Sequence, residues 1–305
     1  MLPHGIAIGV AITVLTAALL ILGYFRSRRR LPFPGFGWFG IAALICAEVL
    51  MFRHVEPVAT YFTPIAWTAY ILIADAAVLA ISGRSRLNDA PLVLGRIAVL
   101  SIPLWLIFEA YNLRLRNWTY VGVPREWPAA LLGYGWSFAT IFPAIFETSD
   151  LIQAILPPLP GRPWRISRKA EIVLMAIGAT CLVVPVALPS HIGAYLFVLV
   201  WIGFVLLLDP LNHWLNLPSF IGDFSEGFRR RAYGFFLAGW VCGWFWEFWN
   251  YWAAAKWHYT FPLMQREKIF EMPAVGFLGF LPFALECFCM YVTAAWLAGW
   301  LKRVK

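Results

Sequence analysis

Seven acidic side chains fall within or at the edges of long apolar windows, where a carboxyl group is costly and usually marks function. They are Glu48, Asp75, Glu109, Glu147, Asp209, Glu247 and Glu286. Only Arg96 offers a basic partner inside an apolar window. We therefore expect most of these acids to carry a proton or to line a wet cavity, and either state would suit proton chemistry.

Two of the acids belong to a repeated Glu-x-x-Asn pattern. Glu109 precedes Asn112, and Glu247 precedes Asn250. A spacing of three residues places both side chains on one helix face. One interpretation is that each pair only holds helices together by hydrogen bonds, since polar side chains serve this purpose in lipid. The other is that the two glutamates act in chemistry.

The aromatic side chains around Glu247 favour chemistry. Its segment contains Trp240, Trp244, Trp246, Trp249 and Trp252, with Phe245 and Phe248 between them. Aromatic faces attract cations, and more strongly in a dry site. A neutral carboxylic acid beside aromatic walls could protonate an alkene while the rings stabilise the resulting carbocation. The alternative is a bulky helix packed against lipid and its neighbours.

Four sequence matches, in the same order, indicate an internal repeat. The matching pairs are Trp67/Asp75 with Trp201/Asp209, Glu109/Asn112 with Glu247/Asn250, Trp118-Thr119-Tyr120 with Trp257-His258-Tyr259, and Phe142–Glu147 with Leu281–Glu286. Their offsets of 134, 138, 139 and 139 residues differ only by short loop insertions. Since equivalent segments run in the same direction, we expect a parallel repeat about an axis along the membrane normal.

The elements that must position these residues are transmembrane helices. The chain has 305 residues, of which 61% are hydrophobic and 13% charged, and its mean hydropathy is +0.72. A soluble domain carries about a quarter charged residues, and a span needs about 20 apolar ones. We predict nine spans, at 5–25, 36–53, 57–81, 92–112, 131–156, 171–188, 194–212, 232–252 and 274–299.

These spans predict an all-α polytopic membrane bundle with about nine transmembrane helices. A leading helix and basic loop (1–31) would precede two four-helix units, at 32–165 and 166–305. With the N-terminus outside, sixteen basic residues lie in inner segments and seven in outer ones. Because inner loops are enriched in Lys and Arg, we expect a cell-membrane protein with a cytoplasmic C-terminus.

One outer loop resembles a known family. It reads Trp118-Thr-Tyr-Val-Gly-Val-Pro124-Arg-Glu126-Trp-Pro. This is similar to the lycopene cyclase domain of membrane-embedded carotenoid cyclases, which have two homologous membrane units and a Gly-x-Pro-x-Glu-Glu segment. The resemblance implies that Glu126 is an acid of the reaction. Trp127 replaces the second glutamate, and the second half has Glu271-Met272-Pro273 instead.

The favoured hypothesis is a membrane protein that binds or transforms an apolar isoprenoid, carotenoid or lipid. Its candidate catalytic acids are Glu109, Glu126, Glu247 and Glu286. Its candidate substrate-binding residues are Asn112, Trp118, Tyr120, Trp244, Asn250, Trp257 and Tyr259. The alternatives are a proton-coupled transporter that uses the same acids, with Asp75, Glu147 and Asp209, and a non-catalytic assembly subunit.

The same pattern argues against other functions. The cysteines and histidines form no metal-ligand spacing, so we expect neither a metal nor another cofactor. The basic residues sit in short clusters between apolar windows, so nucleic acid is not an expected partner. Membrane lipid or an isoprenoid substrate is the expected partner, and the oligomeric state is left open.

Overall fold

The computed structural model describes residues 4–302, which are almost entirely helical, and the predicted all-α multi-pass bundle is confirmed. Within the described chain, eight segments are long and apolar enough to cross a membrane. They are α1 (His4–Arg26), α2 (Gly35–Phe52), α3 (Phe62–Ser82), α5 (Pro91–Leu115), α6 (Trp127–Ile155), α7 (Arg168–Ala187), Ser190–Trp214 with α8 (Ser190–Gly193) and α9 (Phe197–Trp214), and Ala274–Leu297 with α12 (Phe280–Leu297).

The ninth predicted span is α11 (Arg230–Trp252), which is 23 residues long but less apolar than the other eight. Five tryptophans and two tyrosines, together with Glu247 and Asn250, lower its hydropathy. Both of these polar side chains are fully buried. Neighbouring helices therefore surround the polar groups of α11, whereas a helix facing lipid would have to be apolar all round.

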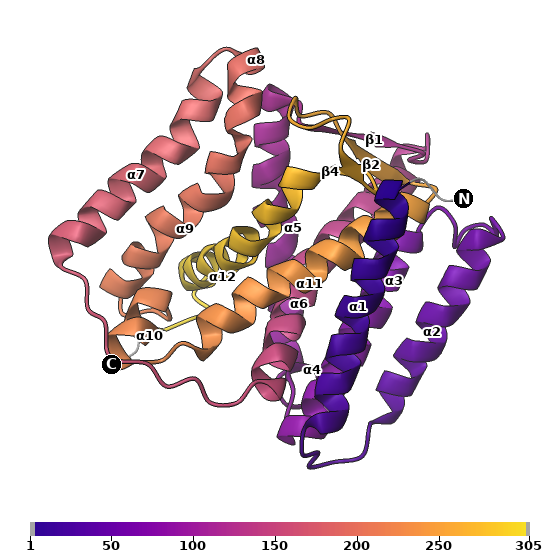
Figure 1. Cartoon of the computed structure of the whole chain (residues 1–305), viewed down its shortest axis with the longest axis horizontal. Coiled ribbons are helices and arrows are strands. Elements are labelled where there is room, and N and C mark those ends of the chain that lie inside the picture. Colours follow the sequence, from indigo (N-terminus) through magenta and orange to yellow (C-terminus); the bar gives the residue numbers. More distant parts are fainter. Residues whose placement is uncertain (1–3, 303–305) are drawn as a thin grey trace.

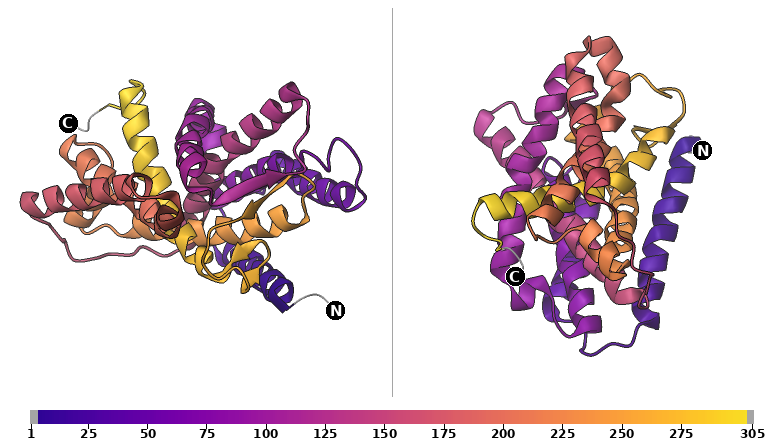
Figure 2. Two further views of the ribbon diagram at one scale, coloured as in Figure 1. Left: turned by 90° about the horizontal axis from the view of Figure 1, so that it is seen from above. Right: turned by 90° about the vertical axis from the view of Figure 1, so that its left-hand side faces the viewer.

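Helices α3, α6, α11 and α12 are the most buried of the long helices and form the centre of the bundle. In the first half α6 packs against α3 and α5, and in the second half α12 packs against α9 and α11. The contact of α6 with α11 joins the halves, while α2 and α7 lie on opposite flanks and α1 stands against α11 (Figures 1 and 2). This arrangement buries the aromatic side chains of both halves against one another.

Two short strands join the halves at one end of the bundle. Strand β1 (Trp118–Val121) follows α5, and β2 (Lys256–Tyr259) follows α11. They pair in antiparallel fashion, with Trp118 opposite Tyr259 and Tyr120 opposite Trp257. Exchanging the two repeats leaves this register unchanged, as a two-fold relation requires. A second small sheet, β3 (Lys268–Ile269) with β4 (Met272–Pro273), follows β2.

Two of the predicted intramembrane acids hold turns in the fold. Asp75 accepts hydrogen bonds from the Ser85 hydroxyl (2.6 Å) and the Leu87 backbone N–H (2.9 Å) at the start of α4 (Arg86–Asp89). Asp209 accepts from two backbone N–H groups at the start of α10 (Phe220–Glu226), at 2.7 and 2.9 Å. Since first-turn N–H groups lack helical partners, these carboxyls serve the turns.

The segments that connect the helices differ in basic residues between the two ends of the bundle. The basic segments around α4 and α10 lie at one end of the bundle, and the β1–β2 pair lies at the other (Figure 1). This is the arrangement that alternating spans produce. The assignment of the basic end to the cytoplasm and the unit boundaries at 31/32 and 165/166 stay predictions.

Candidate functional site

The two glutamates of the Glu-x-x-Asn pattern each meet a tyrosine of the following strand. The Tyr120 hydroxyl on β1 donates to Glu109 Oε1 at 2.5 Å, and the Tyr259 hydroxyl on β2 donates to Glu247 Oε1 at 2.8 Å. The chain turns back at the end of α5 and again at the end of α11. Each turn places the following strand beside the glutamate of the preceding helix. The repeat therefore produces two equivalent Glu–Tyr pairs, one in each half.

The asparagines position the strands. The Asn112 amide donates to the Trp118 carbonyl (2.9 Å) and accepts from its N–H (3.1 Å). Asn250 makes the same two bonds to Trp257, both at 2.9 Å. Each side chain thus acts as a strand partner for a tryptophan backbone. These contacts hold the strands, and the binding of substrate by the two asparagines stays a prediction.

Replacing Asn250 with alanine is expected to destabilise the protein by about 1–3 kcal/mol, because two partly buried backbone groups of Trp257 lose their partners. Thermal unfolding of the detergent-solubilised protein measures the effect. Asn88→Ala is the matched control, since this exposed amide bonds only the Asp89 side chain and should change stability by less than about 0.5 kcal/mol. Equal effects of the two variants would contradict the assignment.

An aromatic cavity of about 140 Å³ lies between the halves, beside the paired strands. Four predicted substrate-binding residues line it, namely Trp118, Tyr120, Trp257 and Tyr259. Half of the other lining residues are also aromatic, namely Tyr61, Trp67, Trp105, Phe108, Tyr134, Phe138, Phe197, Trp201, Trp246, Phe280 and Phe283. The repeat-equivalent pair Trp67 and Trp201 both contribute, so the cavity lies where the two units meet.

The cavity is buried on one side and accessible on the other. Trp67 and Phe108 in its wall are each only 1% exposed. Tyr61, Gly133 and Tyr134, at the start of α3 and the first half of α6, line it and are partly exposed. The more exposed side of the cavity therefore lies at the starts of these two helices, where the Tyr61 hydroxyl donates to the Ala129 carbonyl at 3.1 Å.

The two Glu–Tyr pairs differ in their hydrogen bonds. Glu109 Oε1 accepts from Tyr120 and also from the indole N–H groups of Trp105 (2.9 Å) and Trp118 (3.2 Å). Three donors on one oxygen stabilise negative charge there. Glu247 is fully buried, and its Oε2 has no hydrogen-bond partner in the described part of the chain. The second carboxyl therefore has a free oxygen in a dry surrounding.

The tyrosines of both pairs remain neutral donors. Burial raises the pKa of the Tyr120 phenol well above its usual value, and the neighbouring Glu109 charge raises this pKa further. Burial likewise raises the pKa of Tyr259 well above the ordinary range, with Glu247 as the next cause. Each phenol thus presents a proton between a carboxyl group and the cavity.

Three other predicted site residues lie away from the cavity. Glu126 is exposed at the N-terminus of α6, although Pro124 two residues earlier lines the cavity. Trp244 is buried and stacks on Phe277, with ring centroids 4.0 Å apart. Glu286 is fully buried on α12, and neither of its oxygens has a hydrogen-bond partner among the described residues.

Glu147 has an ion-pair partner that comes from outside the apolar windows, in which Arg96 is the one basic residue. Arg86 extends from α4 into the bundle, and its Nη1 lies 3.2 Å from Glu147 Oε1 and 2.7 Å from Asp150 Oδ2. Arg96 instead lies over the Trp300 ring at 5.4 Å. A long arginine side chain at a helix end reaches polar groups well inside a span.

Sequence reasoning missed two residues of this region. Trp105 donates to Glu109 from one turn earlier on α5, and the spacing of four residues was the available signal. Lys256 lines the cavity from β2, with its Nζ 3.1 Å from Glu271 Oε1. No signal in the sequence indicates that Lys256 lines the cavity, because this residue lies between two predicted spans and only the pairing of β1 with β2 brings it there.

Residues 4–302 contain no group of three or more His, Cys, Asp or Glu side chains that could hold a metal ion. No protein-family model, no curated protein and no solved structure matches this chain. What the geometry itself establishes is a multi-pass helical membrane protein with an aromatic interior, in which two Glu–Tyr pairs adjoin one cavity.

Proposed function

We propose that this protein binds an apolar isoprenoid or related lipid in the aromatic cavity and rearranges it by acid catalysis. The observation that supports the proposal most is the cavity itself, whose aromatic wall from both halves includes the tyrosine of each Glu–Tyr pair. Aromatic walls suit unsaturated hydrocarbon and stabilise cations. The proposed location is the cell membrane, with the strand-bearing end outside.

The size of the cavity limits which ligands can bind in it. A volume of about 140 Å³ is close to the roughly 150 Å³ of an engineered protein cavity that takes one benzene molecule. We infer that the cavity receives one end group of a long chain and that the rest of the chain leaves between α3 and α6. A carotenoid-like polyene with an acyclic end fits this description.

The proposed reaction is a proton-initiated isomerisation. The reaction requires the hydrogen bond between Tyr259 and Glu247 to reverse, so that the Tyr259 hydroxyl turns its proton from Glu247 towards the substrate and the neutral Glu247 carboxyl donates to the Tyr259 oxygen. Glu247 then transfers its proton to that oxygen as the Tyr259 hydroxyl gives its own proton to a substrate alkene, which becomes a carbocation. A second alkene of the same end group attacks the cation and closes a ring. A neighbouring carbon then returns a proton through Tyr259 to the Glu247 carboxylate, so substrate and product have the same composition. The negative charge around Glu109 and the aromatic wall stabilise the cation.

The resemblance to lycopene cyclase domains supports the same class of reaction, with a different acid. That resemblance implies Glu126, whereas the present proposal assigns the proton to Glu247, because Glu126 is exposed outside the cavity. Expression in a lycopene-accumulating host tests the reaction directly. An altered pigment profile is expected, and an unchanged one would argue against cyclisation.

Blocking the cavity should remove ligand binding. Gly133 lines the cavity, and a Cβ at this position would lie 3.4 Å from the Tyr61 ring. We expect Gly133→Leu to fill the entrance and reduce the co-purifying lipid or polyene, measured by mass spectrometry, at least fivefold. Gly135→Leu is the matched control, since a Cβ there meets nothing within 4 Å and Gly135 does not line the cavity. Equal retention in both variants would reject the cavity as the binding site.

A proton-coupled carrier is the second candidate, and Glu286 is the observation that favours it. This carboxyl is fully buried, with both oxygens unpartnered in the described chain. Such a group can hold and release a proton during transport. A carrier would require Glu286 for substrate movement across reconstituted vesicles, whereas the proposed isomerase would keep its activity in Glu286→Gln.

A further inference from the structure

A second cavity, of about 340 Å³, lies near the end of the bundle opposite the paired strands. It is lined by the end of α3, by α4, by α6 and by the start of α11, so both halves contribute to it. The residues that line it are Val78, Ser82, Arg84, Ser85, Arg86, Asp89, Ala90, Asp150, Gln153, Ala154 and Arg230. Three arginines and two aspartates make it polar, in contrast to the aromatic cavity.

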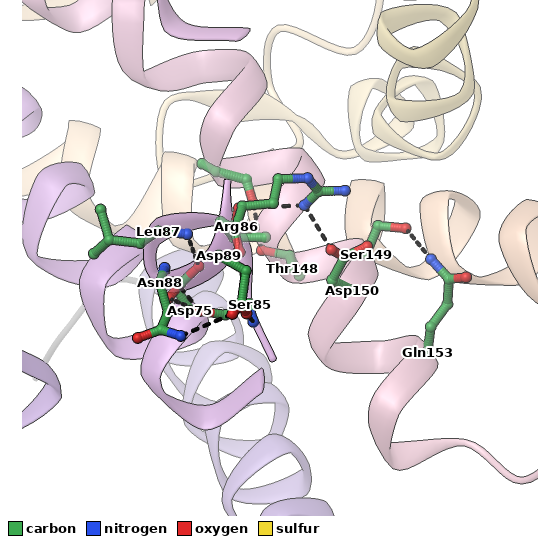
Figure 3. A network of polar contacts seen from close by, with 12 residues as sticks. Asp75, Ser85, Arg86, Leu87, Asn88, Asp89, Thr148, Ser149, Asp150 and Gln153 are labelled. Carbon is green, nitrogen blue, oxygen red and sulfur yellow. Dashed lines mark hydrogen bonds and ion pairs between the residues drawn. The ribbon is translucent and has the colours of Figure 1, made fainter. Parts of the chain in front are cut away.

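The two aspartates are already engaged. Asp150 pairs with Arg86 at 2.7 Å, as Figure 3 shows, and Arg86 also pairs with Glu147. Asp89 accepts the Ser85 backbone N–H (2.7 Å) and the Asn88 side-chain amide (3.0 Å). Asp150 therefore already has a cationic partner, whereas Asp89 bonds only neutral donors of its own turn.

Arg84 and Arg230 remain without an acidic partner. Arg230 donates only to the backbone carbonyls of Gln153 and Leu156, and its buried Nε has no partner in the described chain. Arg84 is exposed and makes no hydrogen bond or ion pair within residues 4–302. Two guanidinium groups, one from the α3–α4 connection and one from the start of α11, thus line one cavity without an ion-pair partner in the described chain.

The internal repeat shows that the fold does not need these polar groups. At the equivalent positions of the other half, Pro218 replaces Arg84, Phe220 replaces Arg86, Cys289 replaces Asp150, Val292 replaces Gln153, and Leu92 replaces Arg230. Phe220, Cys289 and Val292 are packed in the core. The same helix arrangement therefore forms with apolar side chains at these positions, so the polar set points to a ligand.

We propose that this cavity, which we call the arginine pocket, binds a phosphate group between Arg84 and Arg230. Guanidinium groups match phosphate oxygens in geometry and charge, and a tetrahedral anion has enough oxygens to contact two arginines at once. The pocket opens near the helix ends, where phospholipid headgroups lie. The same chemistry belongs to a lipid headgroup or to a free phosphate, and it does not depend on the ligand of the aromatic cavity.

Binding by the purified full-length chain in neutral detergent tests the proposal. The probes are phosphatidylglycerol, phosphatidylcholine and inorganic pyrophosphate, and the readouts are native mass spectrometry and the shift of the thermal unfolding midpoint. We expect saturable binding of phosphatidylglycerol that is at least tenfold weaker in Arg84→Gln/Arg230→Gln. Arg162→Gln/Arg165→Gln, which removes two exposed arginines of the α6–α7 connection, should leave it unchanged.

The outcomes separate the sources of the phosphate. Saturable binding of both phosphatidylglycerol and pyrophosphate assigns the pocket to a phosphate group as such, and binding of phosphatidylglycerol alone assigns it to a lipid headgroup. Should the Arg230 variant fail to fold, Arg84→Gln alone should weaken binding about threefold, since Arg84 has no structural contact to lose. Absence of saturable binding, or equal loss in the control variant, overturns the proposal.

Discussion

Replacing Gly239 with alanine is expected to destabilise the protein by about 3 kcal/mol. Helices α11 and α12 touch at this glycine, and a Cβ there would lie 2.0 Å from the Phe280 backbone oxygen and 3.1 Å from the Ala284 Cβ. The nearest obstacle is backbone, which cannot rotate away as a side chain can. The helices must therefore move apart, and the aromatic contacts along their interface loosen with them.

Equilibrium unfolding in denaturing detergent, followed by circular dichroism, measures this loss. Gly95→Ala on α5 is the control with the opposite sign, because a Cβ there meets nothing within 4 Å. Alanine is the better helix former, so Gly95→Ala should stabilise the protein by about 0.5–1 kcal/mol. If both variants were stabilising, the close approach of α11 and α12 would be refuted.

The repeat explains why this contact is specific to one half. Ser101 occupies the position equivalent to Gly239, and its hydroxyl bonds the backbone of α6 at Phe138 and Phe142. The α5–α6 contact therefore has room for a side chain where the α11–α12 contact has none. On the closer side the Phe280 backbone lies against Gly239 and its ring lies against Gly243.

Topology was the part of the fold that sequence reasoning could reach. Long apolar windows with basic residues between them give helix number and direction, because the bilayer imposes both. Eight of the nine predicted spans meet the requirements of length and hydropathy, and α11 differs because its tryptophans and tyrosines are less apolar. The match of Trp118-Thr119-Tyr120 with Trp257-His258-Tyr259 also predicted the equivalence seen in the β1–β2 register.

The candidate site could be predicted only in part from the sequence, because residue spacing along a helix does not reveal which strand covers that helix. The Glu-x-x-Asn pattern found both carboxyl groups, but the role of each asparagine depends on the strand that folds back over it. The hydrogen-bond partners of Asp75 were hidden for a similar reason, since Ser85 and Leu87 belong to the segment that follows its helix. A search for apolar windows also does not consider how far a long side chain extends. The ion pair of Arg86 with Glu147 was missed for this reason.

Glu247→Gln is expected to abolish the proposed reaction while leaving the fold and ligand binding intact. The amide has nearly the same shape as the carboxyl, and its oxygen still accepts the hydrogen bond from Tyr259 that now measures 2.8 Å. What disappears is the transferable proton. General acid catalysis contributes about 10²–10⁴ in rate, so product in a lycopene-accumulating host should fall at least a hundredfold.

Separate measurements distinguish this outcome from a structural role. Retained polyene, assayed by mass spectrometry of the purified variant, and the thermal unfolding midpoint should both match the unsubstituted protein. Tyr259→Phe is the companion variant, because it keeps the aromatic wall and removes only the hydroxyl between Glu247 and the cavity. Under the proposed relay it should lose product to a similar extent.

Glu109→Gln provides the contrast within the repeat. Its Oε1 accepts three hydrogen bonds, so in the proposed reaction this carboxyl stabilises the substrate carbocation and does not deliver a proton. The amide keeps an acceptor but loses the negative charge, and we expect a smaller loss of product, about tenfold. If Glu247→Gln and Glu109→Gln both keep full conversion and only lower the unfolding midpoint, the carboxyls hold helices together and the acid mechanism is wrong.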